Sequence, residues 1–272
     1  MRRIAFISEK GGTGKTTTAI NVAVGLAKSG KRVLIADLDP QGNASLVLLG
    51  GVPAASPTIG SVLLDQAEAH ETIRPTATPG LDILPSDVTL ADANLALASE
   101  VGRERRLRVA LEEIQERYDY VVLDTSPQRS LLSVNALVYA EEVLVPVDPG
   151  LFAVAGLGQL QATVDEVRRY LDNRALRIAG LILTRTRNDN VSRDVESQLR
   201  TMFGELVHKT TIPTNAKLEE AHSRFQSVLD YSPRSAGAVA YSALTEEIIH
   251  NGRTKNRNGR SAGGSLASHN AA

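Results

Sequence analysis

Residues 10–16 are Lys10-Gly11-Gly12-Thr13-Gly14-Lys15-Thr16. An apolar stretch at residues 4–7 precedes them, and a segment with helical periodicity, residues 16–29, follows. This order of strand, glycine-rich loop and helix is typical of a P-loop, in which glycines let backbone N–H groups curl around phosphate oxygens. The helix would also direct the positive end of its dipole at the phosphates. The stretch therefore predicts a nucleotide site.

The side chains of the loop fit such a site. Lys15 is expected to reach the β and γ phosphates, and Thr16 is expected to offer a hydroxyl to Mg²⁺. A glycine-rich turn with chance lysines is the alternative, but strand, loop, helix and hydroxyl all agree on a P-loop. The predicted nucleotide-binding residues of the loop are Lys10, Gly11, Gly12, Thr13, Gly14, Lys15, Thr16 and Thr17.

The loop departs from the general pattern GxxxxGK[ST], because Glu9 stands where the first glycine belongs. Lys10 adds a second lysine at the head of the loop, and with it the stretch resembles the deviant Walker A motif of the ParA/MinD family of ATPases. The resemblance implies an ATPase that forms a homodimer with ATP. It also implies that Lys10 reaches across the dimer interface to the partner's nucleotide, so that Lys10 and Lys15 are both catalytic.

A second buried-strand pattern, residues 32–36, runs into Asp37-Leu38-Asp39-Pro40-Gln41-Gly42-Asn43. Carboxylates at the carboxyl end of a parallel strand lie beside the phosphate loop. The run resembles the DxDPQGN stretch of ParA proteins, and by that resemblance Asp39 is catalytic and positions the hydrolytic water. Asp37 is then either a metal-side or a structural carboxylate, and a polar turn capped by aspartate is the alternative for the whole run.

A third strand pattern, residues 120–123, ends at Asp124. An acidic residue at the end of an apolar strand is the Walker B arrangement, which holds Mg²⁺ directly or through water. The predicted metal ligands are Thr16, Asp37 and Asp124, and the expected cofactors are ATP and Mg²⁺. Ser126 stands where the family more often has the first of two prolines.

The remaining patterns predict one α/β domain. The chain has 272 residues, of which 42% are hydrophobic, so it can bury a substantial core. The strands lack alternation, which is typical of parallel strands buried on both faces. We therefore expect a doubly wound, mostly parallel sheet flanked by helices, as in P-loop NTPases, over residues 1–250. A flexible, basic tail rich in Gly, Ser and Asn is expected over residues 251–272. Further strands are predicted at residues 81–84, 142–147 and 177–183, and helices at 103–116, 131–139, 154–171, 193–203 and 236–249.

Several absences narrow the class of protein. The chain has no cysteine, which excludes relatives that hold iron–sulfur clusters or metals with thiolates, and its five histidines lack metal-ligand spacing. No apolar span of membrane length and no signal peptide are found, and the tail lacks the amphipathic face that ends MinD relatives. We expect a cytoplasmic protein without a membrane partner.

Residues 211–215 resemble the IPxN segment of the family, and residues 216–223 resemble the LxEAxS stretch that follows it. The family places adenine near this loop, so the resemblance makes Pro213 and Asn215 provisional base contacts. A proline-fixed turn before a helix explains the same residues structurally, and both interpretations stay open.

The resemblance to ParA further implies that the ATP dimer binds nonspecific DNA, which makes it nucleoid-associated, and that a ParB-like partner or cargo adaptor stimulates hydrolysis. Overall charge gives this little support, because 30 basic side chains balance 31 acidic ones. Phosphate contacts would need local clusters of basic residues. The predicted DNA contacts are Arg185, Arg187, Arg193, Lys217 and Arg224.

Three functions remain open on the sequence. The first is a partition ATPase that positions or segregates chromosomal or plasmid DNA. The second is a ParA-like ATPase that positions a protein assembly by the same nucleotide cycle. The third is a P-loop metabolic ligase that uses ATP, against which Lys10 and the DPQGN stretch argue.

Overall fold

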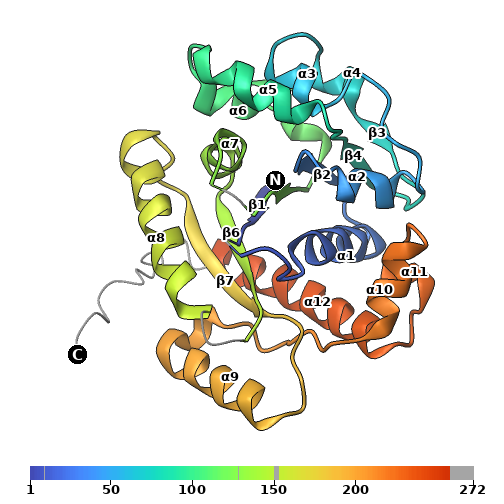
Figure 1. Cartoon of the computed structure of the whole chain (residues 1–272), viewed down its shortest axis with the longest axis vertical. Helices are drawn as coiled ribbons and strands as arrows, with labels where there is room; N and C mark the ends of the chain where they lie inside the picture. The colour runs from blue at the N-terminus through green and yellow to red at the C-terminus, as the bar shows by residue number, and fades with distance from the viewer. Residues whose placement is uncertain (9, 128, 150–152, 258–272) are drawn as a thin grey trace.

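One sheet organises the protein (Figure 1). The structure is a computed structural model, and it describes residues 1–8, 10–127, 129–149 and 153–257. The sheet has the strand order β3-β4-β2-β5-β1-β6-β7, and every pairing is parallel except that of β3 with β4. The predicted doubly wound, mostly parallel sheet is therefore confirmed. The strands are β1 Arg2–Phe6, β2 Val33–Leu38, β3 Arg74–Pro75, β4 Leu81–Leu84, β5 Tyr120–Thr125, β6 Glu142–Val147 and β7 Arg177–Leu183.

The central strands are buried on both faces, as their unbroken apolar runs predict. All residues of β2, β5 and β6 are buried. Successive residues of a strand enter different cores: Ile4 and Phe6 pack on one face of the sheet, whereas Ala5 packs on the other. The sequence patterns located these strands within one or two residues at each end.

Helices cover both faces of the sheet. One core contains side chains of α1, α2, α10, α11 and α12, and the other contains those of α3, α5, α6, α7, α8 and α9. In Figure 1, α1 and α12 lie on one side of the sheet and α7 and α8 on the other. The helices are α1 Lys15–Lys28, α2 Asn43–Leu48, α3 Ile59–Leu63, α4 Ala69–Thr72, α5 Leu90–Ala96, α6 Arg106–Ala110, α7 Leu131–Tyr139, α8 Ala153–Tyr170, α9 Asn190–Phe203, α10 Ala216–Ser223, α11 Val228–Tyr231 and α12 Ala236–Arg257.

The single helix predicted at residues 103–116 is wrong. The segment forms a short 3-10 turn at Arg103–Arg105, helix α6, and a second 3-10 turn at Gln115–Arg117. The side chain of Asn135 on α7 forms hydrogen bonds with backbone groups of this region: its Oδ1 accepts from the Leu107 N–H, and its Nδ2 donates to the Arg103 carbonyl. A buried side chain of a neighbouring helix thus competes with the bonds that a continuous helix would make.

The boundary predicted at residue 251 also differs from the structure. Helix α12 continues to Arg257, so the first seven residues of the expected tail are helical. Adding residues to a helix that is already anchored costs little, because each added residue forms a further hydrogen bond. Residues 258–272, the rest of the expected tail, lie outside the described residues.

Helix α1, which carries the end of the P-loop, is held against α12 at close range. A Cβ atom added at Gly25 would lie 3.1 Å from Cβ of Thr245 on α12. Two turns nearer the loop, the Thr18 hydroxyl and the Tyr241 hydroxyl are 3.1 Å apart. The two helices can approach closely because Gly25 has no side chain. Their contact holds α1, and with it the end of the P-loop, in place against α12.

Candidate nucleotide site

The P-loop lies at the carboxyl end of β1, where it enters α1. Gly12 and Gly14 both adopt φ of 77°, a left-handed conformation that favours glycine. Gly14 is the N-cap of α1, so Lys15 is the first helical residue. The first N–H groups of a helix lack partners within it and are available to an anion. The loop therefore has the backbone form that phosphate binding requires, as predicted.

Side chains within and beside the loop hold it in shape. The Ser8 and Thr13 hydroxyls are 2.8 Å apart, and Thr13 is buried. Thr184, which follows β7, donates its hydroxyl to the Thr13 carbonyl at 2.8 Å. The sequence analysis missed Thr184, although its place just beyond a parallel strand was a usable signal. The P-loop is thus anchored to the carboxyl edge of the sheet as well as to its own strand.

Two buried aspartates face each other across adjacent strands behind the loop. Asp37 of β2 and Asp124 of β5 are register partners, and both are 0% exposed. Burial raises the pKa of each carboxyl above its ordinary value. The charge of Asp37 raises the pKa of Asp124 further, and the charge of Asp39 raises the pKa of both. Lys15 and the Thr16 hydroxyl oppose the rise at Asp124. The pair is therefore strongly biased toward binding a positive charge.

Their hydrogen bonds separate the two aspartates. Asp37 accepts from the Asp39 N–H on Oδ1 and from the Ser45 N–H and hydroxyl on Oδ2. Neither oxygen of Asp124 accepts a hydrogen bond of ordinary geometry from the described part of the chain. A buried carboxylate without donors is costly unless a ligand satisfies it. The geometry thus favours the structural alternative for Asp37 and leaves Asp124 as the carboxylate that can serve a metal.

Asp39 stands just beyond the end of β2 and is 8% exposed. Its Oδ1 accepts from the Gln41 N–H at 3.0 Å. The site therefore combines this carboxylate with Lys15, Thr16 and the free oxygens of Asp124. Carboxylate and hydroxyl oxygens are the ligand types that Mg²⁺ prefers, so the residues present fit Mg²⁺ and a nucleotide triphosphate. Bound Mg²⁺ would neutralise charge on the phosphates; Lys15 and the loop N–H groups would hold and orient them.

A cavity of about 480 Å³ adjoins the loop on the side of α10 and α12. Pro213 and Asn215, the predicted base contacts, both line it, together with Gly12, Thr17 and Tyr241. Asn215 also caps α10, because its Oδ1 accepts from the Lys217 N–H at 2.9 Å. The segment therefore forms the turn before a helix and also lines the cavity beside the P-loop, and its contact with the base stays a prediction.

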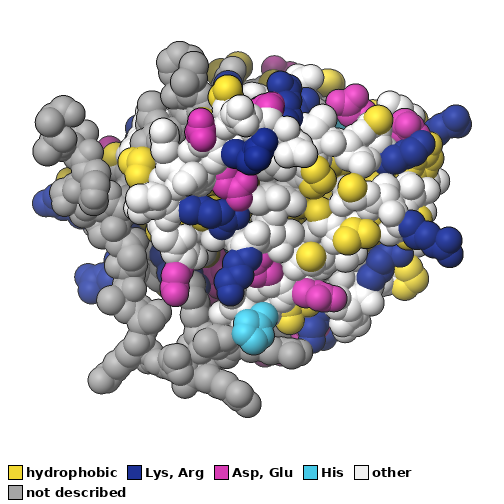
Figure 2. Space-filling model, turned by 90° about the horizontal axis from the view of Figure 1, so that it is seen from below, with side chains coloured by type: hydrophobic (Ala, Val, Ile, Leu, Met, Phe, Trp, Pro, Cys, Tyr) yellow, Lys and Arg dark blue, Asp and Glu magenta, His cyan; other side chains and the backbone are white. Residues whose placement is uncertain are grey.

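The predicted DNA contacts are divided by the structure. Arg185 lies at the mouth of the nucleotide cavity and donates from Nη1 to the Gly12 carbonyl at 2.9 Å. Arg187 and Arg193 are exposed before and at the start of α9, and Arg224 is exposed after α10. Lys217 pairs with Glu220 at 2.6 Å. Figure 2 shows Lys and Arg side chains spread among Asp and Glu on the face seen from below.

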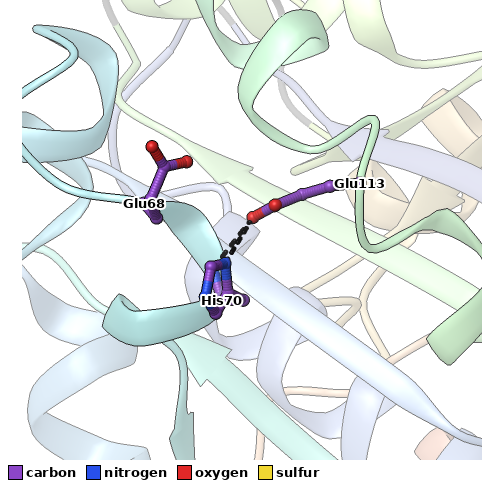
Figure 3. Close-up of side chains that lie close together, drawn as sticks. All are labelled: Glu68, His70 and Glu113. Carbon is purple, nitrogen blue, oxygen red and sulfur yellow. Dashed lines mark hydrogen bonds and ion pairs between the residues drawn. The ribbon is translucent and has the colours of Figure 1, made fainter.

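A cluster that the sequence did not indicate is formed by Glu68, His70 and Glu113. One ligand atom from each lies within 4.8 Å of the others, and all three side chains are exposed. Nδ1 of His70 lies 2.8 Å from Oε1 of Glu113, and Figure 3 marks this hydrogen bond with a dashed line. That hydrogen bond raises the pKa of His70. The cluster contains no P-loop residue, and an exposed ion pair explains it.

No helix in the described residues is long and apolar enough to span a membrane.

The comparisons with known proteins agree with this site. A family model described as an AAA domain, AAA_31, matches residues 1–178. The sporulation initiation inhibitor protein Soj of Bacillus subtilis is 39% identical, over 92% of this chain and 98% of that protein. The chromosome-partitioning ATPase Soj of Thermus thermophilus is 44% identical, over 92% of this chain and 96% of that protein.

Solved structures show the same fold. Cobyrinic acid a,c-diamide synthase of Mycobacterium smegmatis, with bound ATP analogue and magnesium, has a TM-score of 0.80 and 30% identity, covering 96% of this chain and 97% of that one. The cell division ATPase MinD of Pyrococcus furiosus has a TM-score of 0.73 and 27% identity, covering 92% of this chain and 99% of that one. With the P-loop and the free Asp124 carboxylate, these likenesses establish an ATPase that uses ATP and Mg²⁺, and the chain belongs to the ParA/Soj family of partition ATPases.

Proposed function

We propose that this chain is an ATP-gated dimeric switch that binds nonspecific DNA in its ATP state. With a stimulating partner of the ParB type it positions or segregates chromosomal or plasmid DNA in the cytoplasm, on the nucleoid. The observation that carries the proposal is the P-loop headed by Lys10, in a chain that resembles Soj proteins over nearly its whole length.

The surroundings of Lys10 support the dimer. Lys10 is exposed, and among the described residues it forms no ion pair. Its neighbour along the loop, Lys15, is buried at the start of α1. A free ammonium group beside a phosphate site attracts anionic groups, and from the loop surface Lys10 is free to reach a nucleotide bound by a second copy.

The hydrolysis step is proposed to use Asp39. Asp39 lies just past the end of β2, and β2 pairs with β5, the strand that carries Asp124. From there its carboxylate can accept a hydrogen bond from a water and align that water with the γ phosphate. Lys15 and the partner's lysine at position 10 would stabilise charge on the transferring phosphoryl group. Hydrolysis then dissolves the dimer and resets the switch.

The DNA surface is proposed on the α9 side of the molecule, with Arg187 and Arg193 at its centre. Both are exposed, and within the part of the chain that the structure describes the Arg193 side chain bonds only to Asp189 and Asn190, its neighbours in sequence. Exposed arginines on one edge can each neutralise a phosphate, and a dimer would double their number. Arg224, Lys217 and Arg185 are weaker candidates; the last two are already bonded within the chain.

Binding to a short nonspecific duplex tests the function. Fluorescence anisotropy with ATP, with ADP and without nucleotide, each over a salt series, should show binding only with ATP. The logarithm of the affinity should fall with the logarithm of salt by about 0.9 for each phosphate contacted. Arg193→Ala should lower both affinity and slope. Arg108→Ala is the matched control and should change neither, because Arg108 is exposed on α6, which lies at the opposite end of Figure 1 from α9.

Absence of binding in every nucleotide state would contradict DNA as the matrix. A protein scaffold would then become the favoured one, as for a ParA-like ATPase that positions a protein assembly. ATP turnover that requires a small carboxylate acceptor would instead favour the ligase alternative, which the fold likeness to a diamide synthase makes worth measuring.

A further inference from the structure

A ring of hydrogen bonds joins both aspartates of the β2 segment to the residues that follow β4. The Ser45 hydroxyl donates to Asp37 Oδ2 at 2.7 Å, and its oxygen accepts from the Ser86 N–H at 2.8 Å. The Ser86 hydroxyl donates to the Asp39 carbonyl at 2.8 Å. The Asp39 N–H closes the ring on Asp37 Oδ1 at 3.1 Å. Four residues from three segments thus form one closed circuit.

The ring is shielded from water. Ser45 is 1% exposed and Ser86 is 2% exposed. In a buried position a missing partner leaves a donor or acceptor unsatisfied, because water cannot replace it. Breaking one bond of the ring should therefore move the chain locally until its polar groups find other partners.

The backbone of the turn after Asp39 also packs closely against the segment that contains Ser86. Gly42 has φ of 60°, and a Cβ atom added there would lie 3.0 Å from the Ser86 carbonyl oxygen. The Gly42 N–H also donates to the Asp39 carbonyl, at 2.9 Å. The carbonyl of Asp39 is thus held from two directions, by its own turn and by the neighbouring segment.

Asp39 needs such support because of where it stands. The β2 strand ends at Leu38, so no strand pairing holds Asp39. The ring bonds its N–H and its carbonyl, which fixes the direction in which the side chain leaves the backbone. The carboxylate of Asp39 remains available to the nucleotide site. Among the described residues its one hydrogen bond is accepted from the Gln41 N–H in the adjacent turn.

We propose that Ser86 is a positioning residue for ATP hydrolysis: its hydroxyl holds the backbone of Asp39 so that the carboxylate meets the attacking water. Ser45 relays the same constraint from Asp37. The proposal rests on the role proposed above for Asp39. It assigns a function to the segment after β4, from which no residue was expected at the site. It also explains why both carboxylate oxygens of Asp37 accept hydrogen bonds from the chain.

The test uses the full-length protein and Ser86→Ala, which deletes one hydroxyl and keeps the N–H bond to Ser45. The kcat for ATP hydrolysis should fall about tenfold or more, since displacements of about 1 Å can cost two orders of magnitude. The affinity for fluorescent ADP should stay within about threefold, because Ser86 lies outside the P-loop. Hydrogen exchange should accelerate at the amides of Asp39, Gln41 and Gly42 and remain unchanged in α1.

Ser227→Ala is the matched control. Ser227 is 4% exposed, and its hydroxyl bonds Asn21 and Leu229, away from Asp39. Ser227→Ala should lower the free energy of unfolding by about as much as Ser86→Ala does, but it should leave kcat unchanged. Ser86→Thr, which restores a hydroxyl, should recover part of the rate. In an Asp39→Ala background, Ser86→Ala should leave the residual single-turnover rate of hydrolysis unchanged, because the two act through one group.

A kcat within twofold of the unaltered protein in Ser86→Ala would overturn the proposal, and so would an equal fall in Ser227→Ala. Normal hydrolysis in Asp39→Ala would instead refute the role of Asp39 itself, so the two failures are distinguishable. If Ser86→Ala does not fold, Ser45→Ala breaks the ring at another hydroxyl and should give the same split between kcat and ADP affinity.

Discussion

Arg185 donates a hydrogen bond from Nη1 to the carbonyl of Gly12, 2.9 Å away, and thereby links the segment after β7 to the P-loop. Arg185 holds φ of 54°, a conformation that costs a non-glycine residue about 1 kcal/mol or more. Strain of this kind persists only where the surroundings impose it. Arg185 was predicted to contact DNA, and that stays a prediction; its bond to the P-loop leads us to expect that it also supports nucleotide binding.

Arg185→Ala should therefore weaken ADP binding by about three- to tenfold, the loss expected for one hydrogen bond of a charged group. A titration with fluorescent ADP measures this. Arg187→Ala, two residues away and exposed, is the control and should leave ADP affinity unchanged. Unaltered ADP affinity together with weaker DNA binding in Arg185→Ala would restore the original assignment to DNA.

Lys10→Ala should abolish the ATP-dependent dimer and hydrolysis while keeping part of the ATP affinity, because Lys10 is exposed and Lys15 supplies the charge within the same subunit. Sedimentation with a non-hydrolysable ATP analogue reports the dimer. Lys15→Gln offers a contrast, since it should remove nucleotide binding itself. A normal ATP dimer in Lys10→Ala would refute the reach across the interface.

Asp39→Ala should bind ATP, form the dimer and fail to hydrolyse, because it removes the group that aligns water and leaves the P-loop intact. The trapped dimer should elute as a stable species in size-exclusion chromatography with ATP. Steady-state hydrolysis at the normal rate would show that another residue positions the water.

Gly25→Ala should lower the free energy of unfolding by about 1–3 kcal/mol, because the new methyl group meets Thr245 of α12. Gly158→Ala on α8 is the matched control: nothing lies within 4 Å of a Cβ there. That change should raise stability by about 0.5–1 kcal/mol through helix propensity. Urea unfolding of both variants measures the difference, and equal effects would mean that the α1–α12 contact adjusts freely.

Glu247 on α12 should make the free energy of unfolding depend on pH in the acidic range. Burial alone would raise its pKa, but hydrogen bonds from the Lys209 and Thr210 N–H groups outweigh it and leave the pKa lowered. A lowered pKa means that the charged carboxylate stabilises the fold above its ordinary pKa of about 4.3, and this contribution disappears as pH falls through the lowered value.

Glu247→Gln should thus cost about 1–2 kcal/mol at pH 7, and the difference from the unaltered protein should shrink toward pH 3. Glu246→Gln, its exposed neighbour, is the control. A deficit that stays constant with pH would mean that packing, rather than charge, is what Gln disturbs.

Much of the molecule follows from local pattern. The P-loop, the strands at its sides and the aspartates that end them were predicted because a glycine-rich loop needs particular backbone angles and buried strands need unbroken apolar runs. Short elements such as α3 and α5 were not predicted, since a few residues carry too little periodicity. The helix expected at 103–116 failed because Asn135, far along the chain, competes for its backbone.

The sequence by itself determined which cofactors to expect: the P-loop and the strands that end in aspartate predict ATP and Mg²⁺, with Lys15, Thr16 and Asp124 as their predicted ligands, by residue type and order along the chain. Only the tertiary structure decided which aspartate is free, where Arg185 points, and that Ser86 holds Asp39. Those outcomes depend on which loops meet at the carboxyl edge of the sheet. The order β4-β2-β5-β1 brings residues 86, 39 and 124 together, and no pattern local to one segment encodes a contact between segments.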